Sequence, residues 1–201
     1  MYVNRRVLLG GMLAGCVAGP ARALSLKSDR VVDSAGLQLV RPDWPVPQEP
    51  HQLFFIQRST NSNTIVYTAK FDRSGILDRR RPARAYWRRY NTSGERMALR
   101  PFERRFAFGV RARLQNDSGD WLVNAVGAPQ FPIILRQARP FQTQTLAMIG
   151  GRLVRPVYGF VDVDESGFLP RVTGFSIHGV DPPTDRGISE YFTVSGGEFT
   201  E

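Results

Sequence analysis

The sequence predicts an all-β domain. It contains short runs rich in β-branched and aromatic residues, and several runs alternate apolar and polar positions, as half-buried strands do. Turn segments that begin with Asp and end with Gly separate these runs, and Asp72–Gly75 is one example. No helical pattern alternates with the strand-like runs, which excludes a parallel α/β fold. With 201 residues, the chain is long enough to bury one such core.

The spacing of the runs favours an antiparallel meander of about eight strands, folded as a closed barrel or a sandwich. The runs predicted as strands are Leu53–Ser59, Ile65–Phe71, Ala83–Tyr90, Phe106–Leu114, Trp121–Val126, Pro132–Arg136, Thr143–Met148, Pro156–Val163 and Arg171–His178. One short helix is predicted near Gly94–Arg105, where Pro101 suits a first helical turn.

The first 23 residues predict an export signal peptide. A basic start at Arg5 and Arg6 precedes an apolar run, and the Ala-Arg-Ala sequence at residues 21–23 fits a signal-peptidase site. We therefore expect an exported protein of the cell envelope, periplasmic or extracellular. The apolar run is too short to span a bilayer.

Two features of this leader leave alternatives open. Residues 4–9 resemble a twin-arginine export signal. Residues 13–16, Leu-Ala-Gly-Cys, resemble a lipobox, in which Cys16 would carry the lipid. In that alternative the lipid on Cys16 anchors the protein to the envelope, and it is the only membrane attachment that we expect.

Residues 24–50 are predicted to form an extended arm. Four prolines within residues 41–50 exclude a helix or an inner strand there, and Trp44 is expected to attach the arm to the domain. Residues 51–194 then form a single all-β domain, followed by a flexible tail at residues 195–201.

Charge and cysteine content exclude some classes of site. The net charge of +9 combines a basic middle, with twelve Arg and two acids in residues 79–113, and an acidic end, with eight acids and two Arg in residues 162–201. The 25 Arg and two Lys favour an arginine-biased genome, although guanidinium groups also suit phosphate and carboxylate ligands. One cysteine excludes an intrachain disulfide, a cysteine-built zinc site and an iron–sulfur cluster.

Motifs for metals, cofactors and nucleophilic catalysis are missing. Asp162–Gly167 begins like a calcium loop, but Thr173 stands where the twelfth position requires an acid, so a hairpin turn is favoured. His51 and His178 have no metal-ligand spacing, and no Gly-x-Ser-x-Gly elbow or phosphate-binding loop is present. We therefore predict no metal and no cofactor.

The polar segment 57–64 separates two very apolar strands. Because rigid strands often carry function in their connections, Arg58, Asn61 and Asn63, together with Tyr67 on the following strand, are candidate binding residues for an acidic or sugar ligand. The alternative is architectural, with Asn61 and Asn63 capping the backbone of their own turn.

Four arginines form a second candidate surface. Arg84 and Arg88 share one face of a strand, and Arg111 and Arg113 share one face of a later strand. If these strands are neighbours, the four side chains form one basic surface that binds an anionic envelope component, a lipid head group or a polysaccharide. No nucleic-acid partner is expected for an exported protein. The alternative is a solvated face, with Trp87 in the core.

Several motifs together resemble the bacterial domain of unknown function family 4833. They are Gln57-Arg58 with Asn61-x-Asn63-Thr64, Gly75-x-Leu77, Tyr86-Trp87-x-x-Tyr90, Glu103-Arg-Arg-Phe-Ala-Phe-Gly109 and His178-Gly179-x-Asp181. The resemblance covers residues 51–194, and Phe108 departs from it where the family has Tyr. It implies one exported domain, and it transfers no reaction, cofactor or catalytic residue.

The function expected from the sequence is a non-enzymatic binding or structural β module of the envelope. The alternative is a hydrolase that acts on an envelope polymer or lipid. The surroundings of Arg58, Asn61 and Asn63 discriminate between the roles of the loop. Side chains used for backbone capping indicate architecture, whereas convergence with Glu103 or His178 indicates a site.

Overall fold

The computed structural model describes residues 26–115, 118–167 and 171–194. The predicted signal peptide, Cys16 and the tail lie outside the described residues. No helix in the described part of the chain has the length and apolar character needed to cross a membrane. The elements are β1 (Leu26–Ser34), β2 (Gln52–Arg58), β3 (Asn61–Ala69), β4 (Ala83–Arg88), β5 (Arg96–Ala98), α1 (Pro101–Phe106), β6 (Val110–Leu114), β7 (Trp121–Ala125), β8 (Ile133–Arg139), β9 (Gln142–Ile149), β10 (Arg152–Asp164), β11 (Arg171–Val180) and β12 (Gly187–Val194).

The all-β class is confirmed, but the topology differs from a closed meander. The hydrogen-bonded order is β5-β4-β3-β2-β10-β9-β8-β7-β6, and β11, β12 and β1 extend from β10 on a second path. The twelve strands form one mixed sheet that is not closed into a barrel, so the strand number was predicted too low and the closed barrel is wrong. Strands β2 and β10 pair in parallel, which a pure antiparallel meander does not allow.

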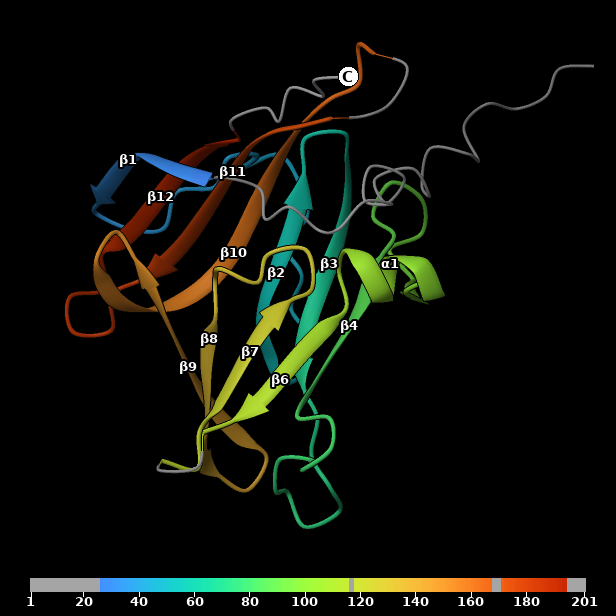
Figure 1. Ribbon diagram of the computed structural model, residues 1–201, viewed down its shortest axis with the longest axis vertical. Coiled ribbons are helices and arrows are strands. Elements are labelled where there is room, and N and C mark those ends of the chain that lie inside the picture. The colour runs from blue at the N-terminus through green and yellow to red at the C-terminus, as the bar shows by residue number, and fades with distance from the viewer. Residues whose placement is uncertain (1–25, 116–117, 168–170, 195–201) are drawn as a thin grey trace, which may run out of the picture.

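Strand β10 changes partner along its length and so divides the sheet into two layers. Arg152–Val154 pair with β9, whereas Tyr158–Val161 pair with β2. Pro156 lies between these stretches, beside a register shift against β11. Because proline has no N–H to donate, it suits the point where one ladder ends and another begins. The layer β6–β9 consequently faces the layer that contains β2, β3 and β4 (Figure 1).

The main core lies between these two layers. Ile65, Tyr67 and Ala69 of β3 all point into it, as their alternation predicts, and Trp87 of β4 joins them at 2% exposure. The assignment of Trp87 to the core is therefore confirmed. Short β5 and α1 replace the longer predicted helix, and the helix begins at Pro101 as expected.

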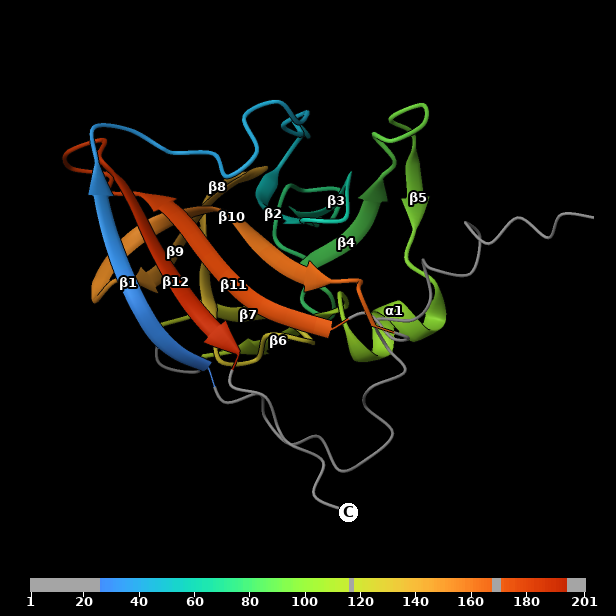
Figure 2. The same cartoon turned by 90° about the horizontal axis from the view of Figure 1, so that it is seen from above.

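A second, smaller core lies on the outer face of β2 and β10. Part of the predicted arm is in fact strand β1, which pairs with β12, so the extended segment starts after Ser34. This segment runs along the upper edge of the molecule in Figure 2. Trp44 packs there beside Phe160, with ring centroids 6.2 Å apart, which agrees with its predicted role in attaching the arm.

Candidate functional site

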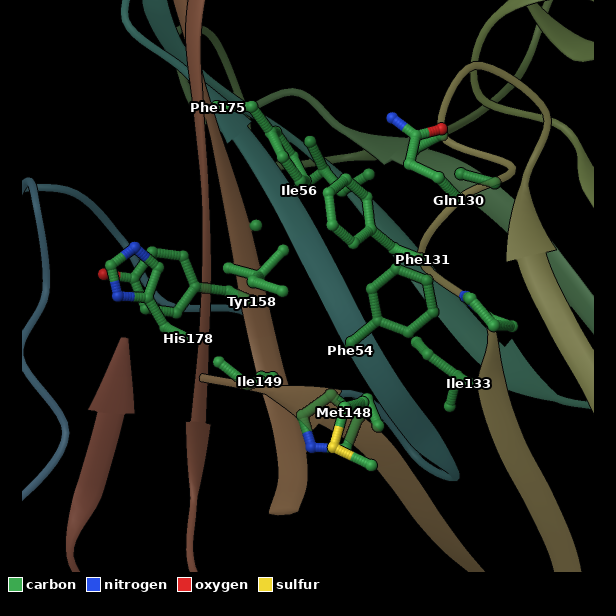
Figure 3. A pocket seen from close by; sticks show the side chains of 17 residues that line it. Phe54, Ile56, Gln130, Phe131, Ile133, Met148, Ile149, Tyr158, Phe175 and His178 are labelled. Carbon is green, nitrogen blue, oxygen red and sulfur yellow. The ribbon is translucent and has the colours of Figure 1, made fainter. Parts of the chain in front are cut away.

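A cavity of about 110 Å³ lies between the two layers. Figure 3 shows the rings of Phe54 and Phe131 beside Ile56 and Ile133, and all four side chains line the cavity. Its walls come from β2, the end of β7, the β7–β8 connection and strands β8 to β11. The lining residues are Phe54, Ile56, Ala125, Ala128, Gln130, Phe131, Pro132, Ile133, Ala147, Met148, Ile149, Pro156, Tyr158, Gly159, Phe175, Ile177 and His178.

The cavity is lined mainly by apolar side chains. Phe131 packs against Phe175 at 5.1 Å between ring centroids and against Phe192 at 4.8 Å, which fixes one wall. Gln130 and Met148 are exposed, so the cavity meets solvent near the β7–β8 connection. An engineered cavity of about 150 Å³ with similar walls stays dry and binds benzene. By that comparison the present cavity accepts a small apolar group or a short length of hydrocarbon.

Arg58 lies one step beyond the cavity along β2. Ile56 lines the cavity, and Arg58 is the next residue on the same face of the strand. The register pairs Arg58 with Val161 of β10, and Val161 with Phe175, which also lines the cavity. The sheet therefore places the backbone of Arg58 beside lining residues, although Arg58 itself is not one of them.

The Arg58 guanidinium is buried without a hydrogen-bond partner at its Nε atom. The residue is 6% exposed, and burial lowers the pKa of its side chain. Its Cζ atom lies 5.0 Å from the centroid of the Trp87 ring, a cation–π contact that holds the group in place. No carboxylate of the described residues pairs with it within 4.0 Å.

Glu103 completes the same cluster from α1. Trp87 Nε1 donates to Glu103 Oε2 at 3.1 Å, and the backbone N–H of Arg100 donates to the same oxygen at 2.8 Å. The second bond caps the start of α1. Arg58, Trp87 and Glu103 therefore converge, and these residues came from three separate sequence motifs. Glu103 also favours the charged form of Arg58 through space.

Asn61 and Asn63 have architectural contacts instead. Asn61 Oδ1 accepts from the Asn63 N–H at 3.1 Å, and Asn63 Oδ1 accepts from the Asn91 N–H at 3.1 Å. Tyr67 stacks on Phe54 at 4.2 Å, and its hydroxyl donates to the Phe108 carbonyl at 3.0 Å. Full burial raises the pKa of Tyr67. These contacts account for Asn61, Asn63 and Tyr67 as parts of the fold. The role of the three residues in binding stays a prediction.

The four arginines of the predicted basic surface lie on two layers. Strands β4 and β6 are not hydrogen-bonded neighbours, so the premise of one continuous surface is wrong. Arg111 and Arg113 pair across strands with Asn124 and Leu122 on the outer face of the β6–β9 layer.

Arg84 and Arg88 instead lie on the outer face of the other layer. Arg84 Nε donates to Thr68 Oγ1 at 3.2 Å. Arg88 Nε lies 3.1 Å from Glu49 Oε1, an ion pair whose N–H is not aligned for a hydrogen bond. Arg96 pairs with the same carboxylate, which is 4% exposed. Part of the local basic charge is therefore neutralised within the fold.

His178 of β11 is fully buried, and although it is one of the lining residues, its ring is directed away from Phe131 (Figure 3). Its Nδ1 lies 2.7 Å from Ser189 Oγ and its Nε2 lies 2.8 Å from Ser176 Oγ. The imidazole stacks on Tyr158 at 4.2 Å, and Figure 3 shows the two rings together, directed away from Phe131. Burial lowers the pKa of His178 to about 4. The ring is therefore neutral at physiological pH, with both nitrogen atoms engaged.

Within the described residues, no group of three or more His, Cys, Asp or Glu side chains gathers as a metal site would require. In the Asp162–Gly167 segment, residues 162–164 are the end of β10, and the chain leaves the strand at Glu165. Asp164 Oδ1 accepts from the Ser166 N–H at 2.8 Å there.

A family model described as domain of unknown function (DUF4833) matches residues 54–191. The chain belongs to this family. The suspected resemblance is thus confirmed, and the match includes the motifs around Arg58, Trp87 and Glu103. Neither the curated proteins nor the solved structures gave a match. The DUF4833 domain has no assigned activity, so a functional argument depends on its geometry.

Sequence reasoning missed the cavity of the DUF4833 domain. Phe131 and Gln130 were in an unassigned connection, and Phe175 was counted only as part of a strand. Composition gives no signal for a void, because a cavity depends on how far apart two layers stand. The one available hint was the Ala-Pro-Gln-Phe-Pro segment at residues 128–132, whose paired prolines fix an irregular connection beside two apolar strands.

Proposed function

We propose that this DUF4833 chain is a non-enzymatic binding module of the cell envelope whose ligand carries an apolar group. The observation that carries the proposal is the apolar cavity between the two layers. The cavity of about 110 Å³ is partly open and is bordered by Phe, Ile and Ala side chains. An apolar ligand group would cover this apolar surface and remove it from water.

The position in the envelope follows from the leader at residues 1–23 and is part of the proposal. Apolar groups outside the cytoplasm are carried mainly by lipids, and a small cavity suits the end of a hydrocarbon chain. The hydrolase alternative would require His178 to reach a substrate. Its ring is fully buried, stacks on Tyr158 and contacts a serine hydroxyl at each nitrogen, which supports the binding role.

The proposal predicts saturable binding of neutral straight-chain alcohols. Titration calorimetry with hexanol, octanol and decanol should show affinity rising by about fourfold per added methylene, the effect of about 0.8 kcal/mol of burial. The rise should level off once the cavity is filled. Ala147 lines the cavity at 9% exposure, so Ala147→Leu should weaken decanol binding by about tenfold or more.

The matched control is Ala138→Leu, at an exposed alanine of β8 that does not line the cavity. It should bind decanol as the unaltered chain does. Thermal unfolding of both variants establishes that they fold. Absence of saturable alcohol binding, or equal binding by Ala147→Leu, contradicts the proposed function.

A further inference from the structure

The buried side chain of Arg58 has one donor that the described protein does not satisfy. At 6% exposure its Nε atom has no hydrogen-bond partner, and no carboxylate of the described residues lies within ion-pair distance. Buried arginines are normally paired, because an isolated charge away from water is costly. Such a group in the interior therefore points to something that binds it.

The nearest acid is held by other donors. Glu103 Oε2 accepts from Trp87 Nε1 and from the Arg100 N–H, at 3.1 and 2.8 Å. These bonds fix Glu103 near the start of α1, where it acts on Arg58 only at longer range. Arg89 lies over the same indole, with its Cζ atom 5.4 Å from the ring centroid, and its like charge lowers the pKa of Arg58 without pairing with it. The cluster keeps an unpaired donor for an anion.

The position of Arg58 connects this donor to the cavity. Ile56, two residues earlier on the same face of β2, lines the cavity, and so does Phe175, which pairs with Val161 beside Arg58. Two residues along a strand span about 6.6 Å. Arg58 itself does not line the cavity, and its guanidinium lies over Trp87 of β4, so a ligand that fills the cavity has to extend past Ile56 to reach it.

We propose that Arg58 binds the anionic head of the ligand whose hydrocarbon part occupies the cavity, so that the ligand is an amphipathic carboxylate with a single hydrocarbon chain. This inference rests on the proposed function. A guanidinium edge presents parallel N–H donors that match a planar carboxylate. The Trp87 ring under the guanidinium fixes its plane, which preorganises this recognition.

The test compares decanoate with decanol at pH 7.5 by titration calorimetry on the full chain. Decanoate should bind about tenfold or more tightly than decanol, because a charge-assisted hydrogen bond distinguishes the two. In Arg58→Gln this advantage should disappear, while decanol binds within about twofold of its original affinity. Decyl phosphate is the third ligand, and tighter binding of it than of decanoate overturns the carboxylate assignment.

Arg89→Gln is the matched control, since both arginines lie over Trp87 but Arg89 is only half-buried. It should retain the preference for decanoate, and loss of the preference there instead overturns the role of Arg58. Equal binding of decanoate and decanol by the unaltered chain also overturns it and leaves the cavity function intact. Failure of both ligands to bind refutes the proposed function itself. Chemical denaturation shows that each variant is folded.

Discussion

The two faces of the layer formed by β2, β10 and β11 each bury one basic side chain, and they treat it differently. On the outer face, His178 is neutral and contacts a serine hydroxyl at each ring nitrogen. On the inner face, Arg58 has a buried nitrogen without a partner and lies beside a cavity. A satisfied buried group stabilises the fold, whereas an unsatisfied one lowers stability and is retained where function needs it.

The largest effect is expected at His178. Its pKa of about 4 in the folded protein lies below the ordinary value of 6.5, so the unfolded chain binds more protons between these values. The free energy of unfolding should therefore fall by about 3 kcal/mol as pH decreases from 6.5 to 4, with this contribution fully present above pH 6.5. Urea denaturation at several pH values measures it.

Other groups also titrate in this range, so His178→Phe provides the reference. The stability difference between the two proteins should shrink as pH falls, because only the unaltered chain carries the imidazole. A difference in the free energy of unfolding that is constant from pH 7.5 to pH 4 would mean that the fold does not hold His178 neutral. The contrast between His178 and Arg58 would then fail.

An intermediate effect on stability is expected at Tyr158, where the segment after β1 covers the outer face. The Tyr158 hydroxyl donates to the Gln38 carbonyl at 2.7 Å and accepts from the Val40 N–H at 3.0 Å. Tyr158→Phe should reduce the free energy of unfolding by about 1–2 kcal/mol and should speed limited proteolysis of residues 35–49. Tyr191→Phe is the control, because that ring contacts His178 but takes no part in these two bonds. Equal proteolysis of both variants contradicts the assigned role of the hydroxyl.

The smallest effect on stability is expected at Arg58. Unlike the two changes above, its substitution should not lower the free energy of unfolding. Arg58→Met keeps an unbranched chain against Trp87 and removes a buried charge whose Nε atom has no hydrogen-bond partner. The free energy of unfolding should stay unchanged or rise by about 1 kcal/mol, measured by urea denaturation at pH 7.5. A loss of more than about 2 kcal/mol would show that Arg58 is a structural residue like His178, and the contrast between the faces would fail.

The strands of the core were predictable because their apolar alternation is strong. In β3 the residues Ile65, Tyr67 and Ala69 face the interior as expected. Strand β1 was missed because its sequence, Leu-Lys-Ser-Asp-Arg-Val-Val-Asp-Ser, is mostly polar, and its partner β12 supplies the hydrogen bonds that define it. The parallel pairing of β2 with β10 could not be inferred either, because the alternation of apolar and polar residues does not specify which strand is the neighbour in the sheet.

The candidate site was predictable only in part. Arg58 was singled out from its loop, and Glu103 was named as a residue with which it might converge. Their common contact with Trp87 depends on α1 folding over the end of β4, which no local pattern specifies. The predicted basic surface assumed that β4 and β6 are adjacent, and the sheet order does not bear out that assumption. Side-chain chemistry could be anticipated, but the meeting of distant elements could not.

The pairing of β1 with β12 has a consequence for the order of assembly. Leu26 is in register with Val194, so this ladder closes a loop of nearly the whole described chain, and such closures are slow because their entropy is lost before any contact is gained. Phe192 of β12 also supports Phe131 in the wall of the cavity. The cavity wall is therefore complete only once β12 has docked, and we expect the cavity to form late in folding.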